Sequence, residues 1–297
     1  IIMLFTLAVL PLAVISELGG FGEMSNRLAA IGPSMVAVAP GDSNWSAIAG
    51  IAGSLGIGLG YIGQPHLVLR FMAISSGNDV SKGRIIAITW AVIAFIGAVL
   101  IGLAGVAFYG PDILGAGNPV PDQEQLMPYI AQQFMPEWLA VIMICGAIAA
   151  MMSTADSQLL SGASCISEDI YRKLFKIDAP QSRLLLISRL ATLAIGVAAF
   201  LLAWRADQMV YSLVLYAWAG LGAAFGPPLL LSLWWRRTSR AGVLAGLIAG
   251  TISVLIWYNV PVLKNSLYEL IPGFMISMLS VVIFSIAIPN KSDREVM

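Results

Sequence analysis

Charged side chains are scarce in this sequence. Of its 297 residues, 11% are Asp, Glu, Lys or Arg, whereas an ordinary soluble domain carries roughly 25%. The 16 basic and 16 acidic residues cancel to a formal net charge of zero, which excludes the clustered basic surface that nucleic-acid binding requires. With 59% hydrophobic residues and a mean hydropathy of +0.87, the composition excludes most soluble folds and predicts that lipid is the main solvent.

Cysteine and histidine are also nearly absent. The two cysteines exclude a disulfide scaffold, and on one helix Cys145 and Cys165 would lie about 30 Å apart, too far to share a metal ion. The single histidine, His66, cannot supply a His-based metal site and is expected to make a packing hydrogen bond. No G-x-S-x-G, H-E-x-x-H or phosphate-cradling G-x-x-x-x-G-K motif is present. The sequence therefore favours a protein that is not an enzyme.

Long apolar stretches, in contrast, are abundant. Crossing a hydrocarbon core of about 30 Å takes roughly 20 residues in a helix. No stretch alternates strictly between apolar and polar residues, as a membrane barrel strand would, so each is predicted to be a helix. The sequence thus predicts an all-α polytopic membrane protein with one transmembrane domain over residues 1–297. We count eight spans, at about 2–18, 45–71, 85–109, 137–166, 184–204, 210–235, 241–258 and 267–289.

The basic residues are distributed unequally between the two ends of these spans. Thirteen of the 16 follow the second, fourth, sixth and eighth spans, and the other 3 are Arg27, Arg205 and Lys264. Since cytoplasmic connections carry the excess of Lys and Arg, this pattern predicts a cytoplasmic C-terminus. The chain begins at Ile1 inside an apolar run, without an initiating Met or a basic leader. We therefore expect it to be an N-terminally truncated piece.

The second span is unusually rich in glycine. Such a density before a proline is typical of a membrane helix that is broken where its backbone faces protein or a watery cavity. Close packing against another helix is the alternative, because small residues are also the usual contact surface between membrane helices. The residues concerned are Gly53, Gly56, Gly58, Gly60 and Gly63, followed by Gln64, Pro65 and His66.

The fourth span carries a stripe of hydroxyl groups. Ala150, Ser153, Thr154 and Ser157 are spaced to share one helix face. Carbonyl and hydroxyl oxygens suit a hard cation such as sodium, by extension from the oxygen ligands of divalent ions. The alternative is that each hydroxyl bonds back to its own helix, which is common in membranes. Asp156 beside the stripe is either an ion or proton ligand within the membrane or a wet residue near the cytoplasmic end.

The sixth span contains a deep tryptophan. Most other tryptophans lie near span ends, where they anchor helices at the headgroup level. Trp218 is followed by Gly222 and the pair Pro227-Pro228, and this combination favours a kinked helix that lines a cavity.

Several of these segments resemble the sodium:solute symporter family, and most closely its sodium/proline symporters. The segment 58–66 is similar to the family motif G-L-G-Y-F-G-Q-P-H, and 152–160 to M-S-T-x-x-S-Q-L-L. The segments 168–171, 216–227 and 268–274 resemble E-D-[IL]-Y, Y-A-W-A-G-F-G-A-A-F-G-P and the signature of the last span. The resemblance extends over nearly the whole chain.

The resemblance implies a broken-helix fold made of two inverted repeats of five helices each. The first span here would be the last helix of repeat one, the next five would be repeat two, and the last two would be peripheral. Position by position, it implies a sodium site at the Ala150 carbonyl and the hydroxyls of Ser153 and Thr154. It places Tyr61 and Pro65 at the solute cavity with Gln64 beside them. Ile57 stands where proline transporters usually carry Trp, and we add Trp218 to this set from its depth.

The expected function is therefore a sodium-coupled secondary symporter that imports a small solute, foremost L-proline, by alternating access in the cytoplasmic membrane. The implied partners are sodium, the solute and the lipid bilayer, with no nucleic acid and no required oligomer. Pantothenate, a monocarboxylate or another amino acid are alternative solutes. A proton-coupled carrier that uses Asp156, or the membrane domain of a transporter-like sensor, are alternative functions.

Overall fold

A computed structural model describes residues 1–32, 35–37, 44–110, 120, 122–175, 179–205 and 210–289. Every regular element of the described residues is helical, as the lack of strict apolar–polar alternation in the spans predicted. Six helices are long and apolar enough to cross a membrane, and two bent helix pairs raise this number to 8 if each pair is one span. Of the basic residues used for the orientation, Lys176, Lys291 and Arg294 lie outside the described residues.

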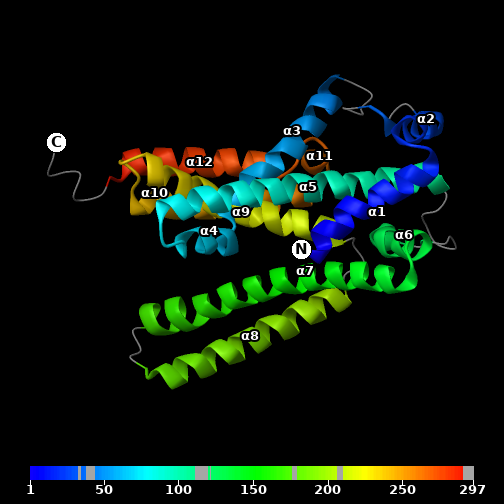
Figure 1. The fold of residues 1–297 in the computed structure, drawn as a ribbon. Helices are drawn as coiled ribbons and strands as arrows, with labels where there is room; N and C mark the ends of the chain where they lie inside the picture. The colour runs from blue at the N-terminus through cyan, green and yellow to red at the C-terminus, as the bar shows by residue number, and fades with distance from the viewer. Residues whose placement is uncertain are drawn as a thin grey trace. The chain divides into compact units, whose positions relative to one another are not determined.

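The chain folds as two compact units, the first made of residues 1–38 and 74–205. In this unit α1 packs against α5, α6 and α7, and α7 lies side by side with α8 (Figure 1). Its helices are α1 (Ile2–Leu18), α2 (Phe21–Ile31), α5 (Gly77–Tyr109), the 3-10 turn η4 (Gln123–Gln125), α6 (Leu126–Phe134), α7 (Glu137–Ser164), the π-helix η5 (Cys165–Leu174) and α8 (Gln181–Trp204).

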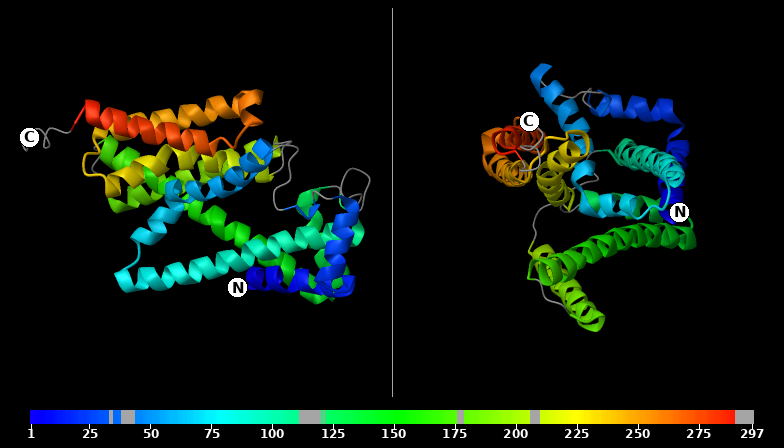
Figure 2. Two further views of the ribbon diagram at one scale, coloured as in Figure 1. Left: turned by 90° about the horizontal axis from the view of Figure 1, so that it is seen from above. Right: turned by 90° about the vertical axis from the view of Figure 1, so that its left-hand side faces the viewer.

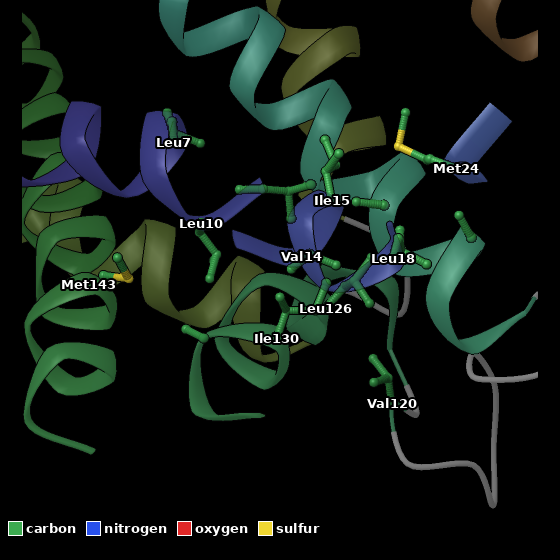
Figure 3. Packing of buried hydrophobic residues seen from close by; sticks show 14 of the residues in the cluster. Leu7, Leu10, Val14, Ile15, Leu18, Met24, Val120, Leu126, Ile130 and Met143 are labelled. Carbon is green, nitrogen blue, oxygen red and sulfur yellow. The ribbon is translucent and has the colours of Figure 1, made fainter. Parts of the chain in front are cut away.

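The core of the first unit forms around α1. Leu10 and Val14 point from α1 toward Ile130 of α6 (Figure 3). Met143 of α7 belongs to the same buried cluster. All four side chains are at most 1% exposed. Glycine permits the close approach of the helices, because a Cβ at Gly97 of α5 would overlap the backbone of α1. Apolar burial therefore holds α5, α6 and α7 against α1.

A sharp corner joins α1 to α2. The two helices are bent by 78° at Gly19 and Gly20, whose φ angles are 96° and 102°. Such angles favour glycine, since a Cβ would be strained there. The amide of Gly20 donates to the carbonyl of Ile15 at 2.8 Å and that of Gly19 to Ser16 at 3.1 Å, which closes the end of α1.

The second unit comprises residues 39–73 and 206–297. Helices α9, α10 and α12 run alongside one another (Figure 2), and α3 packs against α9 and α12. The elements are α3 (Asn44–Gly60), the 3-10 turn η2 (Tyr61–Gly63), α4 (Pro65–Met72), α9 (Val210–Trp234), α10 (Arg240–Asn259), the single turn α11 (Pro261–Lys264) and α12 (Leu270–Ala287).

Small residues bring α10 close to its neighbours. Gly242, Gly246 and Gly250 follow one face of α10 and are buried. The Ser277 hydroxyl of α12 donates to the carbonyl of Gly246 at 2.9 Å, and the Ser285 hydroxyl accepts from the amide of Ser239 at 3.0 Å. Hydrogen bonds and close van der Waals contact thus replace the hydrophobic effect, which cannot join helices inside lipid.

The sixth predicted span, α9, is a helix that continues through Pro227 and Pro228. A proline at position 227 cannot donate to the carbonyl of Ala223, four residues earlier. This carbonyl lies where a Cβ at Gly250 would stand. Helix α10 can therefore cover the carbonyl that the proline leaves free, because Gly250 has no side chain.

Candidate functional site

The second predicted span is broken in the structure. The segments Ala47–Gly63 and Pro65–Met72 are bent by 53° relative to each other. Gln64 between them is extended, with φ −83° and ψ 111°. The ring of a proline disfavours the helical conformation in the residue before it, and Pro65 itself fits the first position of α4. The break predicted from the glycines and Pro65 is therefore confirmed.

The same glycines also allow close packing against another helix, which was the alternative interpretation of this span. A Cβ at Gly63 would stand 2.6 Å from the carbonyl oxygen of Leu221, and one at Gly60 would overlap the indole of Trp218. Across the contact, a Cβ at Gly222 would stand 2.7 Å from the Cα of Gly60. The two readings are therefore compatible, because the helix breaks at the point where it packs most closely on α9.

Four of the predicted solute-site residues form one group at this break. The Trp218 Nε1 donates to the carbonyl of Ile57 at 3.0 Å, and the Gln64 Nε2 donates to the carbonyl of Trp218 at 3.3 Å. The rings of Tyr61 and Trp218 meet edge to face, with centroids 4.8 Å apart and an interplanar angle of 80°. We call Ile57, Tyr61, Gln64 and Trp218 the break cluster.

The break cluster combines a buried anchor with accessible surface. Gln64 is 2% exposed, whereas Tyr61 is 44% exposed and Ile57, Pro65 and Trp218 are half-buried. The Gln64 amide thus contacts α9, while the exposed part of the Tyr61 side chain can meet a ligand. The cluster contains no charged group, so it can bind through ring contacts and hydrogen bonds.

The predicted sodium stripe lies on α7, in the first unit. The Thr154 hydroxyl donates to the carbonyl of Ala150 at 3.2 Å, and the Ser157 hydroxyl donates to the carbonyl of Ser153 at 2.9 Å. The back-bonding alternative is therefore observed for both hydroxyls. Ser153 and Thr154 are exposed and Ala150 is half-buried.

The oxygens of this stripe can still coordinate an ion although their hydroxyls donate hydrogen bonds within the helix. A hydroxyl that donates its proton keeps its lone pairs, and a carbonyl oxygen has a second one. The bond between Thr154 and Ala150 in fact holds two of the three predicted ligand oxygens 3.2 Å apart. In the described part of the chain, no group of three or more His, Cys, Asp or Glu side chains is placed to hold a metal ion. Asp156 is exposed on α7.

A hollow of about 1150 Å³ lies in the second unit, and the sequence did not point to it. It is lined by α3, the start of α9, the end of α10 and the connection to α12, and Ile57 of the break cluster belongs to its wall. Lys264 and Glu269 also line it. Neither residue stands out in the sequence, because each lies at the end of an apolar span where a charge is ordinarily wet.

Comparison with known proteins agrees with the family resemblance of the sequence motifs. Residues 1–250 match the model of the sodium:solute symporter family. The high-affinity proline transporter PutP of Bacillus subtilis is 39% identical over 286 residues, which cover 96% of this chain and 59% of that protein. The sodium/proline symporter of Escherichia coli is 38% identical over 287 residues, covering 96% of this chain and 56% of its own. The chain spans between half and two thirds of the length of these relatives.

Proposed function

This chain belongs to the sodium:solute symporter family, and from this premise we propose that the protein imports L-proline together with sodium by alternating access. The observation that carries the proposal is the break cluster, an uncharged site at a broken membrane helix. Broken helices face the substrate in secondary transporters of the inverted-repeat kind, because their free backbone groups can serve a ligand. The proline transporters among the relatives are consistent with this choice of solute.

Trp218 supports proline as the solute despite the missing tryptophan at position 57. A pyrrolidine ring needs a flat apolar wall, and Ile57 offers none. The indole of Trp218 lies beside position 57 from α9, since its Nε1 donates to the backbone carbonyl of Ile57 at 3.0 Å. Its ring stands edge to face with Tyr61. We propose that these two rings, with Pro65, form the wall against which the solute packs.

For sodium, we propose the carbonyl of Ala150 and the hydroxyls of Ser153 and Thr154 as ligands. The support is chemical, because these oxygens carry no fixed charge and share one face of α7. A neutral site lets a monovalent ion bind and leave, whereas a carboxylate would hold it more strongly.

The protein is multi-pass in the membrane, and its homologues are transporters. We propose that it lies in the cytoplasmic membrane with a cytoplasmic C-terminus. We also propose that the chain acts as one transmembrane domain. In it, α1 would be the last helix of the first repeat. The second repeat would consist of the bent pair α3 and α4, followed by α5, α7, α8 and α9. Helices α10 and α12 would be peripheral.

Uptake measurements test this proposal. The intact protein is expressed in a bacterial host without its own proline uptake, and radiolabelled L-proline, pantothenate and acetate are supplied with sodium or with choline as the cation. We expect sodium-dependent uptake of proline alone. Uptake that persists in choline and collapses with the pH gradient would contradict sodium coupling. Binding of proline without uptake would indicate a sensor instead.

A further inference from the structure

A smaller hollow lies at the turn between α9 and α10, away from the break cluster. Helix α9 ends at Trp234 and α10 begins at Arg240, and the turn between them lies at the same end of the second unit as the last turns of α12 (Figure 2). The hollow measures about 470 Å³, which is within the usual range of about 300–1,000 Å³ for ligand pockets. We call it the arginine hollow, because Arg236 and Arg240 both line it.

Hydrogen bonds fix the turn that carries these two arginines. The Thr238 hydroxyl donates to the carbonyl of Trp235 at 2.8 Å, which ties the turn to the end of α9. The amide of Ser239 donates to the Ser285 hydroxyl of α12 at 3.0 Å, and the Ser239 hydroxyl accepts from the amide of Gly242 at 3.2 Å. These backbone amides are therefore already bonded, and a ligand in the hollow has to bind through side chains.

Positive charge dominates the arginine hollow. Arg236 and Arg240 belong to its wall, and no acidic side chain is among the described residues that line it. The four ion pairs found in the described part of the chain do not include Arg236 or its exposed neighbour Arg237. Two guanidinium groups at one hollow repel each other, and an anion between them removes this repulsion. The planar guanidinium fork suits the oxygens of a phosphate.

The remainder of the wall is largely apolar. Val243 and Leu244 contribute to it from the first turn of α10, and Leu244 is 59% exposed. The half-buried ring of Trp235 lines it at the end of α9. A soluble anion would use the arginines and leave this surface in contact with water. A ligand with an anionic head and a hydrocarbon chain would use both parts of the wall.

The position of the hollow along the helices also favours a lipid. Trp234, at the end of α9, is 76% exposed, and tryptophan at a span end normally lies at the headgroup level. The distribution of basic residues predicts that this end of α9 faces the cytoplasm. The cytoplasmic leaflet carries anionic lipids, and basic pockets between membrane helices on that side bind their head groups.

We propose that the arginine hollow is a binding site for an anionic glycerophospholipid of the cytoplasmic leaflet. The lipid phosphate pairs with the guanidinium groups of Arg236 and Arg240, and an acyl chain lies on Val243 and Leu244. The bound lipid joins the ends of α9 and α10 from the membrane side. The site depends on the location of the chain in a membrane, and it is independent of the identity of the transported solute.

Native mass spectrometry of the purified intact protein in a neutral detergent tests this site. The probe is dioleoylphosphatidylglycerol, and we expect one molecule to be retained more tightly than the others. Arg236→Gln combined with Arg240→Gln should raise the dissociation constant of this molecule at least about tenfold, because hydrogen bonds to charged groups are strong. The matched control is Arg183→Gln combined with Arg189→Gln. It removes two exposed arginines of α8 that do not line the hollow, and it should leave the dissociation constant unchanged.

Two further probes distinguish a lipid from a soluble anion. Dioleoylphosphatidylcholine has the same chains but no net charge, so we expect it to bind at least about tenfold more weakly. Glycerol 3-phosphate has an anionic phosphate but no chains, so it should not displace phosphatidylglycerol at equal concentration. Displacement by glycerol 3-phosphate, or equal affinity for the two lipids, would overturn the proposal.

The variants supply the remaining outcomes. Equal affinity of the parent and the Arg236/Arg240 double variant overturns the proposal. An equal loss in the Arg183/Arg189 control also overturns it, because attraction to the overall charge would then explain the binding. Arg236→Lys combined with Arg240→Lys keeps both charges and should weaken binding less than the glutamine pair. Phosphatidylglycerol should also raise the unfolding temperature of the parent more than that of the glutamine pair. A separate failure of proline uptake would leave the lipid site unaffected.

Discussion

Gln64 is the residue that joins the helix break to its neighbour. Its backbone is extended because Pro65 follows it, and this turns the side chain away from the face it would have in a continuous helix. The amide then reaches the carbonyl of Trp218, which is 154 positions away in the sequence. The Gln-Pro pair predicts the break, but it contains no information about the helix that receives the amide.

Replacing this amide by an apolar side chain of similar length should weaken the second unit. In Gln64→Met the carbonyl of Trp218 loses this hydrogen bond but keeps the one within α9, and we expect the free energy of unfolding to fall by about 0.5–1.5 kcal/mol. Chemical unfolding of the purified protein in detergent measures the change. Gln132→Met, at an exposed position on α6, is the control. An unchanged unfolding free energy in Gln64→Met would show that this hydrogen bond contributes nothing.

Thr154 tests the sodium ligands. Thr154→Val keeps the shape of the side chain but removes its oxygen, so uptake should need at least about tenfold more sodium for half-maximal rate, as metal sites lose about 10–100-fold even from outer-shell changes. Thr154→Ser keeps the oxygen and should behave like the parent. Thr192→Val removes a hydroxyl that bonds back to its own helix in the same way and is the matched control. Unchanged sodium dependence in Thr154→Val would remove this residue from the site.

Among the elements, α3 and α9 illustrate how backbone contact replaces side-chain packing. Gly60 and Gly63 lie against Gly222 and Leu221, so the two helices meet at their backbones. Interhelical contact of this kind is the main source of stability inside lipid. It also brings Trp218 over the break, because a side chain at Gly60 would occupy the place of the indole.

A methyl group at this contact should therefore be costly. Gly63→Ala would place its Cβ 2.6 Å from the carbonyl oxygen of Leu221 and force the helices apart. We expect a loss of about 1–3 kcal/mol in unfolding free energy, typical of overpacking, together with reduced uptake. Gly58→Ala on the same helix meets no atom within 4 Å and should be neutral or slightly stabilising. Equal unfolding midpoints of the two variants would contradict the contact.

For the whole molecule, the distribution of charge predicts the orientation in the membrane. The 16 basic residues divide 13 to 3 between the two sets of span ends, and Lys and Arg cross a membrane reluctantly during insertion. This predicts that Pro289 lies on the cytoplasmic side and Lys264 outside.

Reporter fusions check this orientation. Alkaline phosphatase, which is active only outside the cytoplasm, should be active when fused after Lys264 and inactive when fused after Pro289. Green fluorescent protein should give the opposite pattern at the same two positions. Active phosphatase after Pro289 would reverse the predicted topology.

The sequence by itself determined the solvent, the element type and the position of the break. Hydropathy, helix-length apolar runs and the Gln64-Pro65 pair are local properties, and each acts through the backbone of its own segment. The hydroxyl stripe was equally visible, since spacing along one helix decides which side chains share a face.

Only the tertiary structure decided which helices meet. It placed Trp218 between Ile57 and Gln64, and it left Glu269 only 6% exposed at the wall of an open hollow although the sequence puts this acid at the end of a span. The physical reason is that periodicity gives the direction of a side chain on its own helix, whereas its partner depends on packing with a segment far along the chain. The break and its glycines are therefore predictable from the sequence, whereas the packing of α3 against α9 and α12 is not.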